Sequence, residues 1–207
     1  LIAIIGGQEM NLTFKQQSFD SISKPDYMRL LELRYDVFRK RLKWDLPTEG
    51  NLESDQYDTP DASYVYIEDD LGNILGCGRL IPTTKSYMLK EIFPELLGNQ
   101  MAVESSHVYE LSRFCINKNT SQSNCTLSYS TQFLFKALYL HAVENDISEY
   151  LTVSTLPIER MLKRTGIPFQ RAGDQKVHRL GDTKSVTLSI KINDELRRAV
   201  MKDYDYH

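Results

Sequence analysis

The stretch VYELSRFCIN, residues 108–117, has the residue pattern of a β-strand but carries two ionisable side chains. In an ideal strand, Glu110 lies on one face and Arg113 on the other. Burying either charge inside a sheet is costly unless a partner neutralises it. A bulge at this point would bring both side chains to one side of the strand. The stretch therefore predicts a sheet strand whose charged residues belong to a buried ionic network.

The segments around this strand predict an α/β fold. Residues 63–82 predict a hairpin, because two β-rich runs flank a turn-forming stretch of Asp, Gly and Asn. Residues 25–42 predict a helix with Pro25 in its first turn, and residues 43–62 a long loop. The other predicted elements are a strand at 11–15, a broken helix at 87–97, a helix at 128–145, a strand at 149–155, a helix at 157–164 ended by Gly166, strands at 169–171 and 185–191, and a helix from Asn193. This order predicts a single domain with a mixed, twisted sheet flanked by helices.

The composition limits the classes of function. The 207 residues are enough for one domain, and a net charge of −3 gives no global basic field for nucleic acid. No apolar stretch approaches the ~20 residues of a membrane span. The three cysteines and four histidines have no metal-like spacing, so we expect no metal. We expect Cys77 and Cys115 to be buried, reduced thiols in a cytoplasmic bacterial protein.

The first nine residues stand apart from this pattern. The chain begins with Leu, and Met10 precedes the first predicted strand of the domain. We therefore expect residues 1–9 to be an upstream remnant and the functional domain to span residues 10–207.

Charged residues cluster in three places, whereas no hydrolase, P-loop or dinucleotide-binding motif is present. The clusters are LRYDVFRKRLKWD at 33–45, ESDQYD at 53–58, and Arg79 together with the 108–117 strand. Arg79 ends an apolar run, and a buried arginine needs carboxylate partners. The candidates Asp55, Asp58 and Glu110 predict a shared ion-pair network beneath the long loop.

Taken together, these motifs resemble the signature of the acyl-homoserine-lactone synthases, the autoinducer synthases of bacterial quorum sensing. The resemblance rests on RYDVF, a single Trp, ESDQYD, GCGRL, FPELL and ELSRF in this order. The matching positions are Arg34, Phe38, Trp44, Asp55, Asp58, Arg79, Phe93, Glu110 and Arg113.

The resemblance implies an activity and a fold. Enzymes of this family transfer an acyl group from acyl carrier protein to the amino group of S-adenosylmethionine. The carboxylate then closes the lactone and releases 5′-methylthioadenosine. The fold resembles that of the N-acetyltransferases. S-adenosylmethionine is a substrate, so no cofactor is implied.

The resemblance also implies roles for single residues. The attacking α-amino group has a pKa near ~8, so a base must remove its proton. Glu110 is the candidate base, directly or through water, with Arg113 beside it; a purely structural role as an arginine's partner is the open alternative. The predicted S-adenosylmethionine region and its ion-pair network comprise Arg34, Phe38, Trp44, Asp55, Asp58 and Arg79.

Two further regions concern the acyl donor. Thr152 and Ser154 share one face of the 149–155 strand, and with Phe93 they form the predicted acyl-chain pocket. Thr152 matches the family position associated with 3-oxo chains. A carrier protein is acidic, so Arg160, Lys163 and Arg164 are its predicted docking residues; an ordinary solvated helix face is the alternative.

Two rival functions follow from the same residues. The first is an acyltransferase of the same fold that takes acyl-coenzyme A, but residues 116–128 lack the glycines of a pyrophosphate-binding turn. The second is a silent binding protein for S-adenosylmethionine or the lactone. The presence of all the family's polar positions argues against it.

Overall fold

The computed structural model describes residues 2–5, 8–117 and 124–202, and side chains from residue 11 onward except those of 124–128. These residues form two units. Unit 1 contains residues 2–79 and 113–138, and unit 2 contains Leu80–Ser112 and Tyr139–Lys202. The chain passes from one unit to the other within strands and within a helix, so the units are not successive domains of the sequence.

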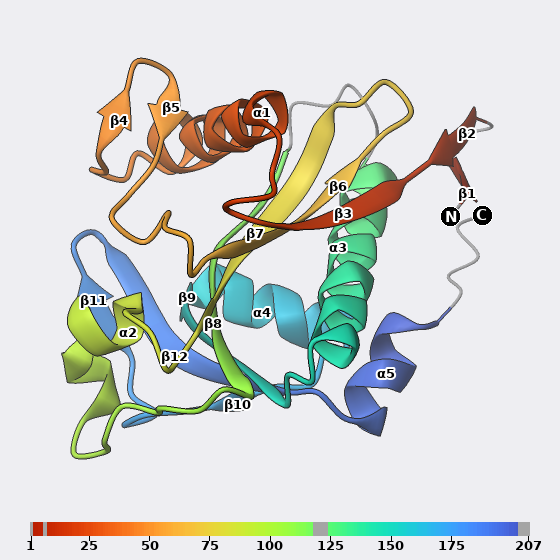
Figure 1. Cartoon of the computed structure of the whole chain (residues 1–207). Coiled ribbons are helices and arrows are strands. Elements are labelled where there is room, and N and C mark those ends of the chain that lie inside the picture. Colours follow the sequence, from red (N-terminus) through yellow and green to blue (C-terminus); the bar gives the residue numbers. More distant parts are fainter. Residues whose placement is uncertain (1, 6–7, 118–123, 203–207) are drawn as a thin grey trace. The chain divides into compact units, whose positions relative to one another are not determined.

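Unit 1 contains antiparallel strand pairs and the N-terminal helix. Its elements are β1 (Ile2–Ile5), β2 (Gln8–Asn11), β3 (Thr13–Ser18), α1 (Lys24–Arg34), the π-helix η1 (Tyr35–Arg41), β4 (Thr48–Glu49), β5 (Leu52–Glu53), β6 (Ser63–Glu68), most of β7 (Ile74–Pro82), the end of β8 (Val108–Ile116) and the first part of α3 (Asn124–Glu144) (Figure 1). β1 pairs with β2, β4 with β5 and β3 with β6, all antiparallel.

Helix α1 begins where the sequence predicts it. The Oγ of Ser23 accepts a hydrogen bond from the backbone N–H of Asp26, and Pro25 occupies the first turn. After Arg34 the chain continues as η1, whose wider turns alter the side-chain spacing. The helix predicted over 25–42 is therefore confirmed, and its second half has the π form that a period of 3.6 residues does not predict.

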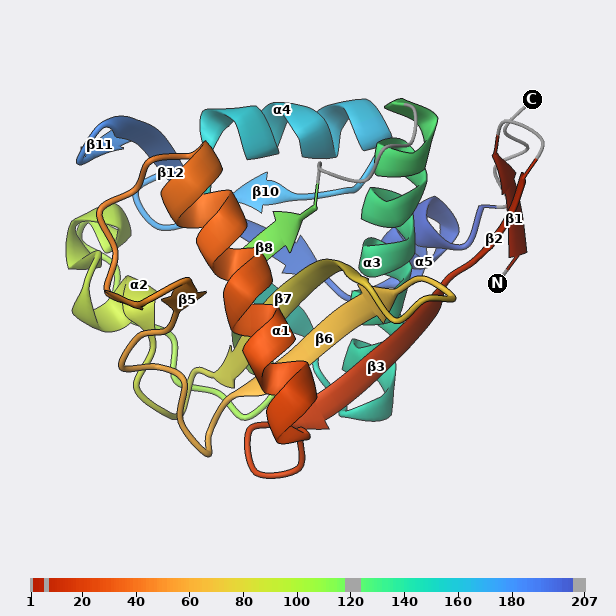
Figure 2. The ribbon, with the colours of Figure 1, turned by 90° about the horizontal axis from the view of Figure 1, so that it is seen from above.

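The two helices of unit 1 cover opposite faces of its strands. Lys15 of β3 lies opposite Tyr66 of β6, and the Tyr66 hydroxyl donates to Asp26 of α1 at 3.1 Å. On the other face, the ring of Phe14 meets Phe133 of α3 edge-on, with centroids 6.2 Å apart. Figure 2 shows α1 crossing β6 and β3. The alternation of side chains along β3 thus places one helix on each face.

Unit 2 holds the rest of the sheet strands and several helical segments. Its elements are the end of β7, α2 (Met88–Glu91), the 3₁₀-helix η2 (Pro94–Leu97), the start of β8, the end of α3, β9 (Glu149–Thr155), α4 (Leu156–Thr165), β10 (Gln170–Arg171), β11 (His178–Leu180), β12 (Thr183–Lys191) and α5 (Asp194–Val200). β9 runs parallel to β8 and antiparallel to β12, which also pairs with β10 and β11. The sheet is therefore mixed, as predicted.

The parallel pairing of β8 with β9 is short. It covers three positions and ends at Glu110 opposite Leu151, although both strands continue beyond them. Paired residues of a parallel ladder point to the same face, so Glu110 shares a face with Leu151. Thr152 and Ser154 lie on the opposite face of β9.

Most predicted elements are confirmed within a few residues. The strands at 108–116 and 149–155, the hairpin at 63–82 and the helix ended by Gly166 (φ +73°) lie where the sequence places them. Three predictions were incomplete. The 43–62 loop contains the β4–β5 pair, α3 begins four residues earlier than predicted, and β11 was not predicted. Among the described residues, no helix has the length and apolarity that crossing a membrane requires.

Candidate active site

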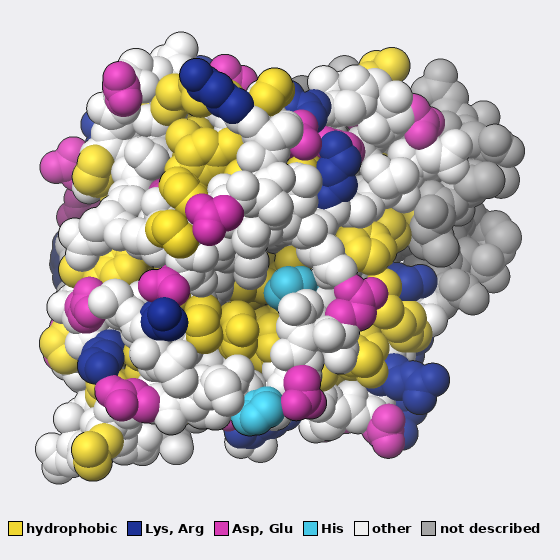
Figure 3. Space-filling model, in the orientation of Figure 1, with side chains coloured by type: hydrophobic (Ala, Val, Ile, Leu, Met, Phe, Trp, Pro, Cys, Tyr) yellow, Lys and Arg dark blue, Asp and Glu magenta, His cyan; other side chains and the backbone are white. Residues whose placement is uncertain are grey.

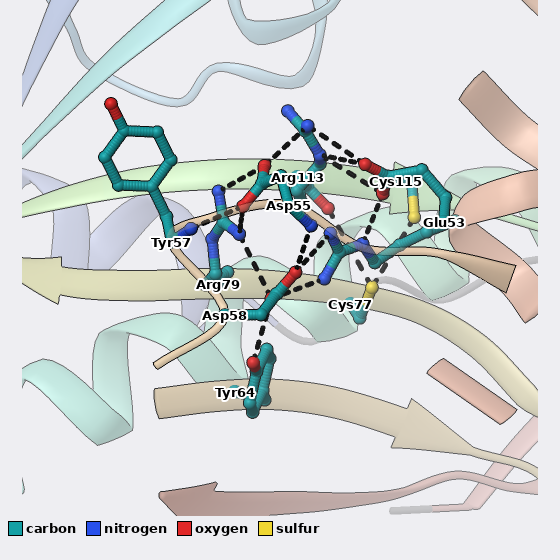
Figure 4. A network of polar contacts seen from close by, with 10 residues as sticks. Glu53, Asp55, Tyr57, Asp58, Tyr64, Cys77, Arg79, Arg113 and Cys115 are labelled. Atoms are coloured by element: carbon teal, nitrogen blue, oxygen red, sulfur yellow. Dashed lines mark hydrogen bonds and ion pairs between the residues drawn. The ribbon is translucent and has the colours of Figure 1, made fainter. Parts of the chain in front are cut away.

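Six charged side chains of unit 1 form a closed ring of ion pairs (Figure 4). Three arginines alternate with three carboxylates, and each arginine bridges two carboxylates. The order is Arg34, Glu53, Arg113, Asp55, Arg79, Asp58 and back to Arg34. No side chain of the ring is more than 9% exposed. Because the formal charges cancel, the ring satisfies the requirement that buried charges be paired.

Arg34 joins helix α1 to the segment after β5. Its Nε donates to Glu53 at 2.6 Å, and its two Nη atoms donate to the two oxygens of Asp58 at 2.7 and 2.9 Å. Such a bidentate pair fixes the plane of the guanidinium as well as its position. The sequence predicted Arg34 and Asp58 as network members, and the structure confirms their contact.

The other two arginines come from neighbouring stretches of β-structure. Arg113 of β8 donates from Nε to both oxygens of Glu53 at 3.1 and 3.2 Å, and its Nη2 lies 2.6 Å from Asp55. Arg79 of β7 pairs with both oxygens of Asp55 and lies 3.0 Å from Asp58. The predicted role of Asp55 and Asp58, which is to hold the N-terminal loop through arginines, fits these contacts.

The loop itself orients the carboxylates. The backbone N–H of Asp55 donates to Asp58 at 2.9 Å, and the N–H of Tyr57 donates to Asp55 at 2.9 Å. The hydroxyl of Tyr64 in β6 also donates to Asp58 at 2.9 Å. These backbone N–H groups and the Tyr64 hydroxyl therefore orient the carboxylates of Asp55 and Asp58 in addition to the arginines.

Electrostatics keep the ring charged. Burial by itself raises the pKa of Asp58, but the guanidinium groups of Arg34 and Arg79 outweigh it and hold that pKa well below its usual range. Burial also raises the pKa of Asp55, and Arg79 and Arg113 more than offset this, so that pKa is lowered as well. Burial lowers and the two acidic partners raise the pKa of Arg34, with a net rise. All these groups are ionised at neutral pH.

Arg113 occupies an unusual backbone conformation. Its φ is +51°, in the left-handed region that non-glycine residues rarely adopt. Such strain persists only where the surroundings over-determine it, and the two carboxylates on its guanidinium are such surroundings. The sequence predicted a bulge that brings Glu110 and Arg113 to one side of this strand. The structure shows left-handed backbone at Arg113, and the bulge itself stays a prediction.

Aromatic rings lie beside the ionic ring. The Arg113 guanidinium lies over the Phe38 ring, 5.6 Å from its centroid, and Phe38 stacks on Trp44 at 5.2 Å between centroids. The backbone N–H of Trp44 donates to the Phe38 carbonyl at 2.9 Å, just after η1. Phe38 is buried and Trp44 is half-buried. The structure therefore brings Phe38 and Trp44 together with Arg113, and their role toward S-adenosylmethionine stays a prediction.

Glu110 of unit 2 has backbone partners. Its Oε1 accepts from the N–H of Leu89 at 2.7 Å, and its Oε2 accepts from the N–H of Met88 at 3.0 Å. The side chain is 1% exposed. These two donors are the first N–H groups of α2, so Glu110 caps that helix from β8.

The predicted acyl-chain residues divide into two groups. Thr152 and Ser154 are buried and their hydroxyl oxygens lie 3.2 Å apart, so the structure brings these two together. Phe93 is half-buried in the α2–η2 segment. Glu110 binds the start of this segment on the face of β8 and β9 that is opposite to Thr152 and Ser154. The grouping of Phe93 with Thr152 remains a prediction.

The predicted docking residues lie on α4. Arg160, Lys163 and Arg164 are exposed. In the same helix, Glu159 pairs with Arg171 at 2.8 Å. On the face drawn in Figure 3, described basic and acidic side chains are interspersed, so neither sign forms an extended patch there.

Sequence reasoning missed Glu53. It is 0% exposed and bridges Arg34 and Arg113, the place for which Glu110 was considered. The sequence contained a signal for it, because Glu53 begins the ESDQYD motif two residues before Asp55.

Cys77 and Cys115 are buried thiols as predicted, with sulfurs 3.5 Å apart. No group of metal ligands exists among the described residues.

Comparisons with known proteins show the family. The family model described as autoinducer synthase matches residues 18–200. An acyl-homoserine-lactone synthase of Aliivibrio fischeri is 50% identical over 93% of this chain and 100% of its own, and one of Vibrio anguillarum is 44% identical over 92% and 99%. The chain belongs to the autoinducer synthase family. It is an acyltransferase with acyl-homoserine-lactone synthase activity, as the residue pattern predicted.

Solved structures show the same fold. The crystal structure of the AHL synthase LasI, 33% identical, covers 93% of this chain and 94% of its own with a TM-score of 0.81. TofI in a ternary complex with an inhibitor and MTA is 31% identical, covers 93% of this chain and 97% of its own, and has a TM-score of 0.78. A putative N-acetyltransferase from Lactobacillus plantarum, 15% identical, has a TM-score of 0.59 over 89% of this chain and 99% of its own. The predicted N-acetyltransferase-like α/β fold is therefore confirmed.

Proposed function

We propose that this synthase transfers a 3-oxo-acyl chain from acyl carrier protein to S-adenosylmethionine. The amine nitrogen attacks the thioester carbonyl, so that an amide forms and the carrier thiol leaves. A carboxylate oxygen of the methionine part then attacks its γ-carbon, and the bond from that carbon to the sulfonium breaks. The products are an acyl-homoserine lactone and neutral methylthioadenosine. The MTA in the ternary complex of TofI supports this choice of substrate.

The aromatic pair of unit 1 supports binding of a sulfonium. A cation binds favourably over an aromatic face, and Trp44 is half-buried beside Phe38. The ring arginines are already neutralised by carboxylates, so they position the surrounding elements rather than supply free positive charge. On this basis the ring fixes α1, the 53–58 loop and β8 as a frame for S-adenosylmethionine.

The acyl donor differs among proteins of this fold, because BjaI is a CoA-dependent acyl-homoserine lactone synthase. Its likeness to this chain, at 19% identity, concerns the fold alone. Two observations favour a carrier protein for this chain. The first is that residues 116–128 contain none of the glycines of a pyrophosphate-binding turn. Residues 118–123 of this stretch lie outside the described structure. The second is that the exposed cations of α4 suit an acidic protein surface.

A 3-oxo preference is supported by the hydroxyl pair of β9. Thr152 and Ser154 are buried, and their oxygens lie within hydrogen-bond distance. A hydroxyl in this pair has a proton to donate to a keto oxygen, which an unsubstituted chain lacks. The expected discrimination is modest, since one neutral hydrogen bond contributes about 0.5–1.5 kcal/mol.

The test is a comparison of kcat/KM for three donors of equal chain length: 3-oxo-acyl carrier, unsubstituted acyl carrier and 3-oxo-acyl-coenzyme A. Each is given with saturating S-adenosylmethionine, and lactone and methylthioadenosine are both quantified. We expect the 3-oxo-acyl carrier to have the highest value and to release methylthioadenosine in equal amount to lactone. An equal or higher value with the coenzyme A thioester would overturn the carrier assignment, and preference for the unsubstituted chain would overturn the 3-oxo assignment.

A further inference from the structure

We propose that Glu110 is a positioning residue, which acts on the reaction by holding helix α2 as its N-terminal cap. Its two carboxylate oxygens accept from the two leading N–H groups of that helix, at Met88 and Leu89. The kinetic part of this proposal rests on the function proposed above, whereas its structural part does not. It gives the buried carboxylate a task that neither sequence reasoning nor comparison with relatives assigned.

Helix α2 lacks a side-chain cap from its own N-cap residue. Tyr87, at the N-cap position, has extended backbone (φ −144°, ψ 155°) and no side-chain capping bond. Its hydroxyl donates to the Val103 carbonyl at 2.8 Å instead. The usual capping residues Ser, Thr, Asp and Asn are absent from this position. The acceptor for the helix's leading N–H groups therefore comes from Glu110 on β8.

Helix α2 depends on this cap for its position. Helix α2 is four residues long, and so short a helix has almost no stability apart from its tertiary contacts. A carboxylate at a helix N-terminus makes charge-assisted hydrogen bonds and interacts favourably with the positive end of the helix dipole. Glu110 is 1% exposed, so water does not compete for its oxygens. The cap therefore decides where the first turn of α2 lies.

The far end of the same segment is also fixed. The backbone N–H of Asp174 donates to the Leu96 carbonyl at 3.0 Å, and the Gln100 amide donates to the Gly173 carbonyl at 2.8 Å. Gly173 approaches Leu96 so closely that an added Cβ would lie 2.1 Å from the Leu96 oxygen. The α2–η2 segment, with Phe93 in its middle, is thus held by β8 at one end and by residues 172–174 at the other.

The cap and the chain-selecting hydroxyls lie on opposite faces of β8 and β9. Glu110 and Leu151 share one face, and α2 begins on that face. Thr152 and Ser154 point to the other face of β9. Because the α2–η2 segment carries Phe93, a predicted acyl-chain residue, loosening α2 should lower the rate of turnover. Because the cap lies on the face away from Thr152 and Ser154, the choice between 3-oxo and unsubstituted chains should not change.

The test separates a cap from a general base by rescue. Glu110→Gln keeps the size of the side chain but replaces one acceptor oxygen with an NH₂ group, so one N–H of α2 loses its acceptor. Met88→Pro removes the Met88 N–H at the first helical position, where proline is tolerated, and the extended backbone of Tyr87 suits a residue before proline. In the Glu110→Gln, Met88→Pro double variant, the one amide oxygen of the side chain accepts from the one remaining donor, the Leu89 N–H. Met88→Ala is the control for loss of the methionine side chain.

The readouts are amide exchange at Met88 and Leu89, kcat, KM and the lactone product ratio. We expect Glu110→Gln to speed amide exchange about tenfold at Met88 or Leu89, whichever loses its acceptor, in keeping with the loss of one charge-assisted hydrogen bond, and to lower kcat. Adding Met88→Pro should restore both, adding Met88→Ala should restore neither, and the product ratio should stay constant throughout.

Two results would overturn the proposal. One is wild-type exchange at both Met88 and Leu89 in Glu110→Gln, which would mean that Glu110 does not hold the helix. The other is a Glu110→Gln, Met88→Pro variant with protected Leu89 but no recovery of kcat, which would place Glu110 at the reacting atoms as the base. The exchange measurement needs no acyl donor, so an error in the donor assignment leaves it valid.

Discussion

Glu53 and Glu110 are both almost fully buried, at 0% and 1% exposed, yet their charges are neutralised in different ways. Glu53 lies in a ring of side chains where three arginines meet three carboxylates. Glu110 receives two backbone N–H groups of a one-turn helix. A buried carboxylate thus holds distant side chains in unit 1 and holds the main chain in unit 2.

The two solutions distribute their consequences differently. In the ring every member has two partners of opposite charge, so removing one leaves two others incompletely paired. At Glu110 the expected consequence is a shift of the first turn of α2. Substitutions in the ring should therefore lower the free energy of unfolding more than substitutions outside it. The opposite ranking would contradict this difference between the two carboxylates.

The largest effect is expected from Asp58→Ala. Arg34 and Arg79 would remain buried without one of their carboxylates, and breaking a buried pair costs about 3–5 kcal/mol. The free energy of unfolding, measured by chemical denaturation, should fall by that order. Asp45→Ala is the matched control, because its pair with Arg39 is exposed and such pairs contribute roughly 0–1 kcal/mol. Equal losses for the two variants would show that the ring is not a stabilising unit.

Arg113→Lys is expected to reduce activity more than stability. Lysine keeps the charge but cannot bridge Glu53 and Asp55 with a planar fork, so the strained backbone at this residue loses its support. We expect kcat/KM to fall on the order of 100-fold, as small misplacements near a reacting centre do. Arg179→Lys, whose pair with Asp182 is exposed, serves as the control. Wild-type kcat/KM in Arg113→Lys would mean that the ring does not contribute to catalysis.

Acid should weaken the ring of ion pairs in unit 1. The pKa values of Asp55 and Asp58 are lowered in the folded protein, so their contribution to stability is complete above the unfolded value near ~3.9 and is lost as the pH falls below it. Between pH 5 and 3 we expect a loss on the order of 1–2 kcal/mol from these groups. Asp58→Asn should have a flatter profile over this range. A slope as steep as that of the wild type would contradict the assignment.

The smallest effect is expected on the surface of α4. Reversing the charges of Arg160 and Lys163 to Glu should raise KM for the acyl carrier roughly 3–10-fold at low salt and less at high salt, because the attraction is screened. KM for S-adenosylmethionine should not change. Lys184→Glu, another exposed cation of unit 2, is the control. A carrier KM that is equally raised by both changes would mean a general charge effect without a docking site on α4.

The ring was largely predictable because opposite charges on buried segments must meet. Arg34, Asp55, Asp58, Arg79 and Arg113 were all predicted from this requirement and from the family motif. Glu53 was overlooked although the same motif contains it. The partner of Glu110 was not predictable in this way, because a backbone N–H is present at every non-proline residue and leaves no pattern in the sequence.

Element types were predicted better than local geometry. The period of apolar residues indicated the helix after Ser23, but the turn to π geometry at Tyr35 depends on packing that the period does not record. The left-handed backbone at Arg113 likewise follows from the two carboxylates that hold its guanidinium. Both departures occur beside the ring, where tertiary contacts outweigh local propensity.

The central claim is that the aromatic and ionic frame of unit 1 serves S-adenosylmethionine, while the hydroxyls of β9 select the acyl chain. The most direct test is mass spectrometry of the lactones formed from an equal mixture of 3-oxo and unsubstituted acyl carriers. Thr152→Val should lower the ratio of 3-oxo to unsubstituted lactone up to about tenfold, as loss of one hydrogen bond predicts. Trp44→Leu should lower the total yield and leave the ratio unchanged. An unchanged ratio in Thr152→Val, or a shifted ratio in Trp44→Leu, would contradict this division of roles.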